Sequence, residues 1–259
     1  IATSLSHWSG GVTCAPTTIE LVMVRQRFLT ALGITGELLI TAGAIVLLYL
    51  GWQLWINNAI QANAQQRIVE QNIQSWGTET PNPTASETWP APVLDTVSKG
   101  GIIGNLYIPR FGATSTRAVG ESVDPNVTLN RGYYGHYTQT QMPGEPGNFA
   151  LAHHRGGWGT AFKQAQLLRT GDHIYLETKL GYYGYTIRNI EYVRPTGVDV
   201  LNEVPGSTDS PGKQSYLTIT TCSPIDGNAE RLIIYADLDS FRARKAGPFP
   251  ELAPLIAKA

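Results

Sequence analysis

The sequence is poor in cysteine, in helical pattern and in clustered charge. These scarcities limit the fold classes and binding partners that can be expected for the chain. Its 259 residues carry only two cysteines, Cys14 and Cys222, and 19 basic side chains against 20 acidic ones. With a net charge of −1 and no basic stripe, nucleic acid is not an expected partner. The 27 glycines and 16 prolines separate short strand-like runs, which favours an all-β domain over a helical bundle.

A stretch without any charge lies near the N-terminus. Residues 38–56 contain no acidic or basic side chain and, at about 1.5 Å per helical residue, would span the roughly 30 Å hydrocarbon core of a bilayer. Arg25 and Arg27 precede the stretch, and the positive-inside rule assigns such a flank to the cytoplasm. We therefore predict a single-pass transmembrane helix at residues 35–57, with a cytoplasmic N-terminus and the following residues outside the cell.

Two other interpretations of this stretch are open. It could be the apolar part of a cleaved signal peptide, with Ala-Asn-Ala at 62–64 as the cleavage site, or a buried core helix. The start of the protein is open as well, because Met23 is an alternative start that would make residues 1–22 an artefact. Cys14, if present, lies on the cytoplasmic side, so no disulfide with Cys222 is expected.

Composition divides the chain into five parts. Residues 76–98 are rich in Thr, Ser, Pro and Glu, which is typical of a tether. Strand-like runs follow at regular spacing, at 102–108, 148–152, 173–178, 184–193, 215–222 and 231–237. With one short helical candidate at 160–168, this pattern predicts a closed barrel or a sandwich. The predicted parts are a cytoplasmic segment (1–34), the transmembrane helix (35–57), an extracellular linker (58–99), a catalytic domain (100–241) and a peripheral tail (242–259).

Cys222 stands where a predicted strand ends. Residues 215–222 alternate apolar and polar side chains and are rich in β-branched residues, and Pro224 cannot continue a sheet ladder. Arg231 opens the next strand-like run, so a short connection would return it beside Cys222. A lone exported thiol beside a fixed cation is a candidate nucleophile. The alternative is a buried structural cysteine.

A second candidate element ends in adjacent histidines. Residues 147–159 form a strand-like run that leads into His153, His154 and a glycine-rich turn. A strand end followed by a loop displays side chains on a rigid scaffold, and a His brought near a Cys forms the usual thiol nucleophile pair. Adjacent strand residues point to opposite faces, so the two histidines would not easily share one metal ion. We expect no metal site and no cofactor.

These motifs resemble those of the sortase family. Thr-Ile-Thr-Thr-Cys at 218–222 with the downstream Arg231 is similar to the sortase signature T-L-x-T-C and its arginine. Ala-His-His-Arg at 152–155 is similar to the A-G-H-R segment that contains the catalytic histidine of these enzymes. The resemblance covers roughly half of the chain, and Gly-His-Tyr at 135–137 is similar to class E, actinobacterial, membrane-anchored sortases. Two positions depart from the pattern, because Ile219 replaces Leu and His153 replaces Gly.

The resemblance implies a fold and a set of roles. The expected fold is a closed sortase-type β-barrel with short helices. Cys222 would be the catalytic nucleophile, His154 the general acid and base, and Arg231 the group that binds the substrate carbonyl or the oxyanion. Register with the A-G-H-R segment favours His154 over His153 as the catalytic histidine. The residues expected to line the groove or orient substrate are Tyr134, His136, Tyr137 and Thr221.

The resemblance also implies an activity and partners. Sortases cleave a Leu-Pro-x-Thr-Gly-like or Leu-Ala-x-Thr-Gly-like sorting signal between Thr and Gly and join the Thr carboxyl to an amine through a Cys thioester. The expected partners are secreted proteins with C-terminal sorting signals, a peptidoglycan precursor or pilin amine, and the lipid bilayer. The alternatives are an exported cysteine peptidase, an L,D-transpeptidase, which the Thr-Thr-Cys-Ser-Pro setting disfavours, and a non-catalytic tethered β-domain.

Overall fold

The computed structural model describes residues 18–53, 57–77, 89–157 and 161–257. The chain divides into two compact units, Ile1–Leu54 and Trp55–Ala259. The expectations for Cys14 and for most of the Thr- and Pro-rich tether lie outside the described residues. So does part of the glycine-rich turn that follows the adjacent histidines.

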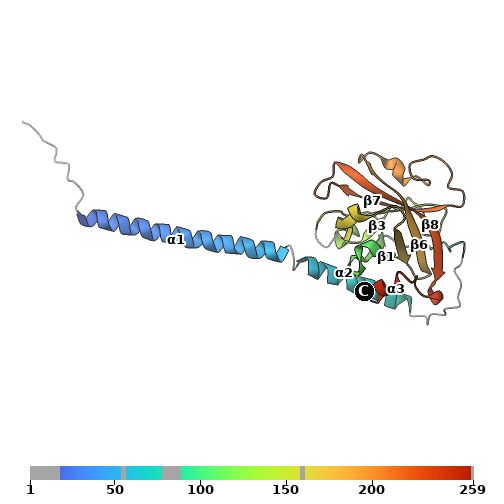
Figure 1. Ribbon diagram of the computed structural model, residues 1–259, viewed down its shortest axis with the longest axis horizontal. Coiled ribbons are helices and arrows are strands. Elements are labelled where there is room, and N and C mark those ends of the chain that lie inside the picture. Colours follow the sequence, from blue (N-terminus) through green and yellow to red (C-terminus); the bar gives the residue numbers. More distant parts are fainter. Residues whose placement is uncertain (1–17, 54–56, 78–88, 158–160, 258–259) are drawn as a thin grey trace, which may run out of the picture. The chain divides into compact units, whose positions relative to one another are not determined.

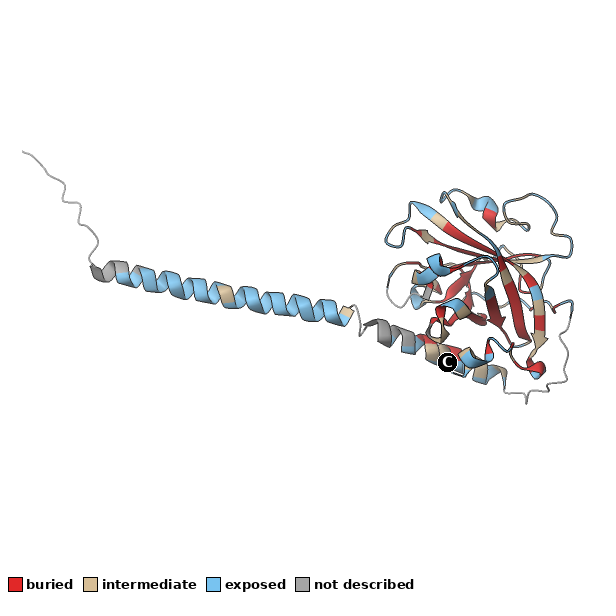
Figure 2. Ribbon diagram, in the orientation of Figure 1, coloured by how far each residue is buried: buried red, intermediate tan, exposed pale blue. Residues whose placement is uncertain are grey.

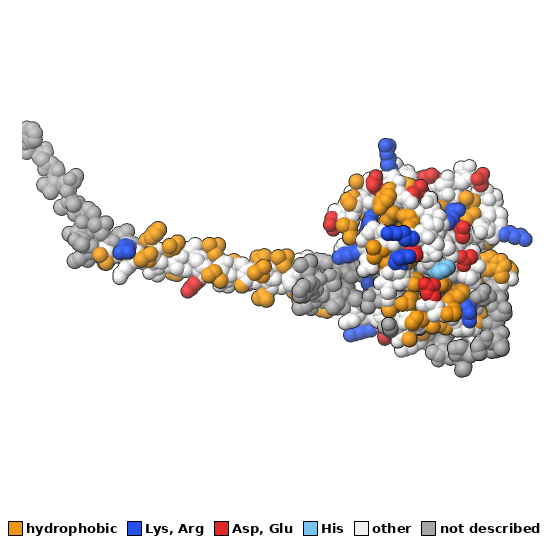
Figure 3. All heavy atoms as spheres, viewed as in Figure 1, with side chains coloured by type: hydrophobic (Ala, Val, Ile, Leu, Met, Phe, Trp, Pro, Cys, Tyr) orange, Lys and Arg blue, Asp and Glu red, His pale blue; other side chains and the backbone are white. Residues whose placement is uncertain are grey.

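The first unit contains one long helix, α1 (Thr18–Gly51). Its segment Arg25–Gly51 is long and apolar enough to cross a membrane, and its side chains are exposed rather than packed into a core. Hydrophobic side chains gather along its surface (Figure 3). This environment disfavours the core-helix interpretation and leaves a membrane anchor or a signal sequence.

In the second unit, the described strands form one closed barrel in the order β1-β2-β3-β4-β7-β8-β6-β5 (Figure 1). The strands are β1 (Ile102–Tyr107), β2 (Arg117–Glu121), β3 (Tyr134–His136), β4 (Gly147–Ala152), β5 (His173–Glu177), β6 (Gly181–Val193), β7 (Ser215–Ser223) and β8 (Glu230–Ala243). The pairs β2–β3 and β4–β7 are parallel, and the other neighbours are antiparallel. The predicted closed β-barrel is therefore confirmed.

Short helical segments lie between the strands and after β8, as expected. The predicted helix at 160–168 is a 3-10 helix, η5. The segments are η2 (Pro109–Phe111), η3 (Ala113–Ser115), η4 (Leu129–Arg131), η5 (Ala161–Leu167), η6 (Val198–Leu201), η7 (Arg244–Ala246) and the C-terminal α3 (Ala253–Ile256).

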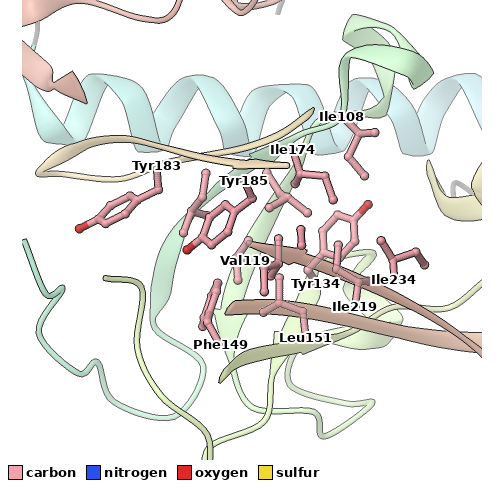
Figure 4. Close-up of a cluster of buried hydrophobic side chains, with 14 of the residues drawn as sticks. Ile108, Val119, Tyr134, Phe149, Leu151, Ile174, Tyr183, Tyr185, Ile219 and Ile234 are labelled. Carbon is pink, nitrogen blue, oxygen red and sulfur yellow. The ribbon is translucent and has the colours of Figure 1, made fainter. Parts of the chain in front are cut away.

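The barrel interior is filled by large apolar side chains, and the central strands are buried along most of their length (Figure 2). Alternation along each strand directs every second side chain inward. In β7 and β4 these include Ile219 and Leu151, which lie with Val119 and Phe149 in one buried cluster (Figure 4). Burial of one such side chain contributes about 2 kcal/mol. The inward residues therefore fix which side chains remain on the outer face.

A second helix, α2 (Asn57–Trp76), packs against the barrel at β1 and β2. Val69 of this helix is fully buried, and the Asn72 side-chain amide donates to Asn105 Oδ1 on β1 at 2.9 Å. The sequence placed this segment in the linker 58–99, because its Gln- and Asn-rich composition shows no strong apolar stripe. The structure instead makes it part of the barrel unit, which begins at Trp55.

Segments on both sides of the expected catalytic domain also pack on the barrel. Leu94, from the predicted linker, is buried, and its amide N–H donates to the carbonyl of Pro143 at 3.0 Å. At the other end, β8 continues to Ala243, and Phe249 and Leu252 of the predicted tail join a buried cluster with tyrosines of β1, β5 and β6. The ordered unit is thus larger than the predicted span 100–241.

Candidate active site

Cys222 and Arg231 face each other across the β7–β8 hairpin. The two residues are directly paired in the antiparallel ladder, next to the last pair before the turn, Ser223 with Glu230. Paired residues place their side chains on the same side of a sheet, so the thiol and the guanidinium share one face. Cys222 is a free, partly exposed thiol. Arg231 donates through Nη1 to the carbonyls of Asn228 and Glu230, each at 3.0 Å.

The parallel pairing of β4 with β7 brings the adjacent histidines to the same end of the barrel. The last registered pair is Ala152 with Thr220. The amide N–H of His153 then donates to the carbonyl of Thr220 at 3.1 Å, which extends the ladder by one step. His154 and Cys222 each lie two residues beyond the last pair. They are therefore neighbours at the ends of adjacent strands.

Strand alternation puts His154, Cys222 and Arg231 on the outer face. Thr221 is buried and lies on the inward side of β7, together with Ile219. Its hydroxyl donates to the carbonyl of His153 at 2.7 Å. Thr221 thus links β7 to β4 on the inner side of the barrel. This contact favours a structural role over the expected role in orienting Arg231 or the substrate.

His153 and His154 occupy opposite environments. The His153 side chain is only 3% exposed, and its ring lies 4.4 Å from the Tyr134 ring centroid to centroid. Burial lowers the pKa of His153 to about 4, so it is neutral at physiological pH, and its Nδ1–H donates to the carbonyl of His154 at 2.6 Å. His154 is partly exposed, and its Nε2 lies 3.2 Å from Oδ1 of Asn130. Only His154 presents its ring on the side of the thiol.

The residues predicted to line a groove near the Gly-His-Tyr segment also differ in burial. Tyr134 and His136 are 1% and 2% exposed. Tyr134 belongs to the hydrophobic core, and His136 Nδ1 lies 2.7 Å from a carboxylate oxygen of Glu121. Both side chains lie inside the barrel because alternation directs these positions inward, so the prediction that they line a groove is corrected to a packing role. Tyr137 is partly exposed, and its hydroxyl lies 3.0 Å from that of Thr220 on the outer face.

Comparison with known proteins bears on what this arrangement does. The family model of the Sortase domain matches residues 106–239, about half of the chain. Sortase SrtE2 from Streptomyces coelicolor is 31% identical over 214 residues, which cover 80% of this chain and 82% of that relative. The chain belongs to the sortase family.

Sortases are cysteine transpeptidases, and other relatives agree with this assignment. Sortase SrtE1 from Streptomyces coelicolor is 32% identical over 219 residues, covering 82% of this chain, although the match spans only 58% of that relative. The solved structure of the SrtA sortase from Actinomyces oris matches with a TM-score of 0.60 at 32% identity, covering 64% of this chain and 96% of that chain. The predicted resemblance to sortases, with class E proteins among the similar ones, is confirmed.

The sortase fold gives the substitution of Gly by His at position 153 a simple structural meaning. The side chain points inward and fills core volume against Tyr134 and Phe162, whose ring centroid is 5.9 Å away. It does not crowd the outer face, where His154 and Cys222 lie. Asn130, by contrast, had no signal in the sequence, because it lies outside every recognised motif and reaches His154 only through the fold.

Proposed function

We propose that this chain is a transpeptidase that cleaves a sorting signal of the Leu-Pro/Ala-x-Thr-Gly type between Thr and Gly and transfers the Thr carboxyl to an amine. The observation that carries the proposal is the placement of one thiol, one imidazole and one guanidinium on the outer face at the ends of three adjacent strands. The pairing Cys222–Arg231 and the parallel ladder from Ala152 to Thr220 support this placement.

Each of the three side chains has a distinct task. The Cys222 sulfur attacks the Thr carbonyl carbon, and the acyl-enzyme splits one difficult displacement into two easier ones. His154 gives a proton to the departing glycine amine and later takes a proton from the incoming amine. The Arg231 guanidinium keeps a permanent charge and has five N–H donors, so it can bind the developing oxyanion while Nη1 remains bonded to the hairpin carbonyls.

The apolar helix α1 supports a location for this chemistry. We propose that it anchors the protein as a single-pass membrane protein, with Arg25 and Arg27 toward the cytoplasm and the barrel outside. Secreted proteins with sorting signals and a peptidoglycan precursor or pilin amine are the proposed substrates, because both pass this surface of the cell.

Hydrolysis is the competing outcome, because water can resolve the same acyl-enzyme. The full chain in detergent micelles would be incubated with Leu-Pro-x-Thr-Gly and Leu-Ala-x-Thr-Gly peptides, with and without an added glycine- or diaminopimelate-based amine. We expect mass spectrometry to find a ligated product in which the amine replaces glycine at Thr, and no product with Cys222→Ala. Rapid release of the free Thr acid without ligation would instead identify a cysteine peptidase.

A further inference from the structure

Asn130 contacts the proposed acid–base residue. Its Oδ1 lies 3.2 Å from Nε2 of His154. An amide oxygen only accepts, so the contact places the proton of the neutral imidazole on Nε2 and leaves a lone pair on Nδ1. We propose that Asn130 is a positioning residue that orients the His154 ring and selects its tautomer. This proposal deepens, and rests on, the function proposed above.

The backbone that carries Asn130 is held from both sides. Asn130 lies in η4, where its own amide N–H donates to the carbonyl of Pro125 at 2.9 Å. Just before it, Thr128 is fully buried, and its hydroxyl donates to the carbonyl of Ser122 at 2.6 Å. A side chain on such a fixed segment loses little freedom on bonding to His154, which is what a positioning contact requires.

Helix α2 supports this segment from outside the barrel. The side-chain amide of buried Gln65 donates to the carbonyl of Arg131, the residue after Asn130. The next residue, Gly132, adopts a φ of +79°, and a Cβ there would lie 3.1 Å from the Gln65 amide nitrogen. The helix and the segment are therefore closely fitted, and α2 contributes to the placement of Asn130.

The contact assigns the two ring nitrogens of His154 to different tasks. Nδ1 accepts the proton that the Cys222 thiol gives up as sulfur attacks, and the same nitrogen returns a proton to the glycine amine as the C–N bond breaks. Throughout, Nε2–H stays bonded to Oδ1 of Asn130, which also stabilises the imidazolium that exists between the two transfers. No further reactant is needed for this exchange.

The test compares Asn130→Leu, which removes the acceptor at similar size, with Asn130→Asp, which keeps it. The full chain in detergent micelles, labelled with ¹⁵N-histidine, would be studied with the His154 signals assigned from His154→Gln. We expect wild type and Asn130→Asp to show a single Nε2–H tautomer, and Asn130→Leu to show ring shifts averaged between two tautomers. With an active sorting peptide, Asn130→Leu should acylate Cys222 about ten-fold more slowly at an unchanged KM.

Controls separate this proposal from the proposed function and from a general folding defect. Asn126→Leu changes an exposed asparagine of the same segment and should match wild type in both measurements. Unchanged His154 shifts in a folded Asn130→Leu protein would overturn the proposal, as would an equal loss of acylation in Asn130→Leu and Asn130→Asp. If no peptide acylates even the wild type, the proposed function fails, whereas the tautomer measurement still decides the role of Asn130.

Discussion

His153 and His154 are adjacent in sequence but lie in different environments. Alternation along β4 sends one ring into the core and the other to the outer face. The buried ring packs on Tyr134, and burial lowers its pKa to about 4. The partly exposed ring of His154 lies on the side of Cys222, where the proposed chemistry would take place. The inward histidine thus supports the strand end from which the outward one would act.

The buried histidine predicts an acid-sensitive fold. His153 has a folded-state pKa of about 4, whereas in an unfolded chain a histidine titrates near pH 6.5. Below about pH 6.5 the unfolded state binds the extra proton, so the free energy of unfolding falls by up to about 1.4 kcal/mol per pH unit until about pH 4. In His153→Phe this contribution should disappear, and urea unfolding at a series of pH values measures it.

A matched control is available on β5. His173 is exposed there, and His173→Gln should keep the wild-type dependence of unfolding on pH. Equal slopes for wild type and His153→Phe between pH 6.5 and 4 would contradict the account of a neutral, buried imidazole.

Single residues also show where sequence reasoning stops. Cys222 and Arg231 could be paired from the sequence because a short hairpin determines their register. The choice between the histidines rested on a motif, and the structure adds the physical reason. The burial of Tyr134 and His136 could not be predicted, because three-residue β3 is too short for alternation to reveal its inward face. Asn130 could not be found either, since nothing local links it to His154.

Among the elements, α2 carries the largest difference between expectation and structure. Its sequence is polar, and the apolar contact with the barrel comes chiefly from one buried position, Val69. Further contacts secure its C-terminal turns: Asn72 bonds to Asn105, and the Arg244 guanidinium lies 5.1 Å from the Trp76 ring centroid. Such dispersed contacts leave no periodic signal in a sequence, so a docked helix was predicted to be a linker.

The packing of α2 on the barrel should be measurable by comparing a buried with an exposed substitution on this helix. Val69→Ala should lower the free energy of unfolding by about 2 kcal/mol, because it removes apolar volume from a fully buried site. Ile60→Ala, on the same helix but at a position that is 54% exposed, should change it by less than about 0.5 kcal/mol. Urea unfolding followed by tryptophan fluorescence measures both. Similar small effects would show that α2 is not packed on the barrel in solution.

Strand prediction succeeded where alternation was long enough to read. β1, β4, β5, β6, β7 and β8 were each predicted in the right place from apolar and β-branched patterns. β2 and β3 were missed, because β2 has charged residues at both ends, Arg117 and Glu121, and no apolar alternation, and β3 is only three residues long. The regular spacing left a barrel and a sandwich open, and the resemblance to sortases favoured the closed barrel. The parallel pairing of β4 with β7, which brings His154 near Cys222, could be found only from the tertiary structure.

At the scale of the whole molecule, the chain has two units of different character. One consists of an apolar helix with the length of a bilayer span, and the other is a barrel that carries His154, Cys222 and Arg231 at one end of β4, β7 and β8. The barrel unit includes α2 and the C-terminal residues, so the compact unit that carries the proposed site begins near Trp55 rather than at Gly100. Experiments on activity are best done with the full chain for this reason.

The most direct test of the account is to trap the acyl-enzyme. The full chain in detergent would be mixed with a sorting peptide whose Thr–Gly bond is intact, quenched in acid and mapped by peptide mass spectrometry. We predict that the peptide fragment ending in Thr is found as a thioester on Cys222. Arg231→Lys should lower the rate of thioester formation about 100-fold, because a lysine cannot present the planar guanidinium fork. His154→Gln should lower this rate further. Turnover of the same peptide by Cys222→Ala, or an adduct on any other residue, would contradict the account.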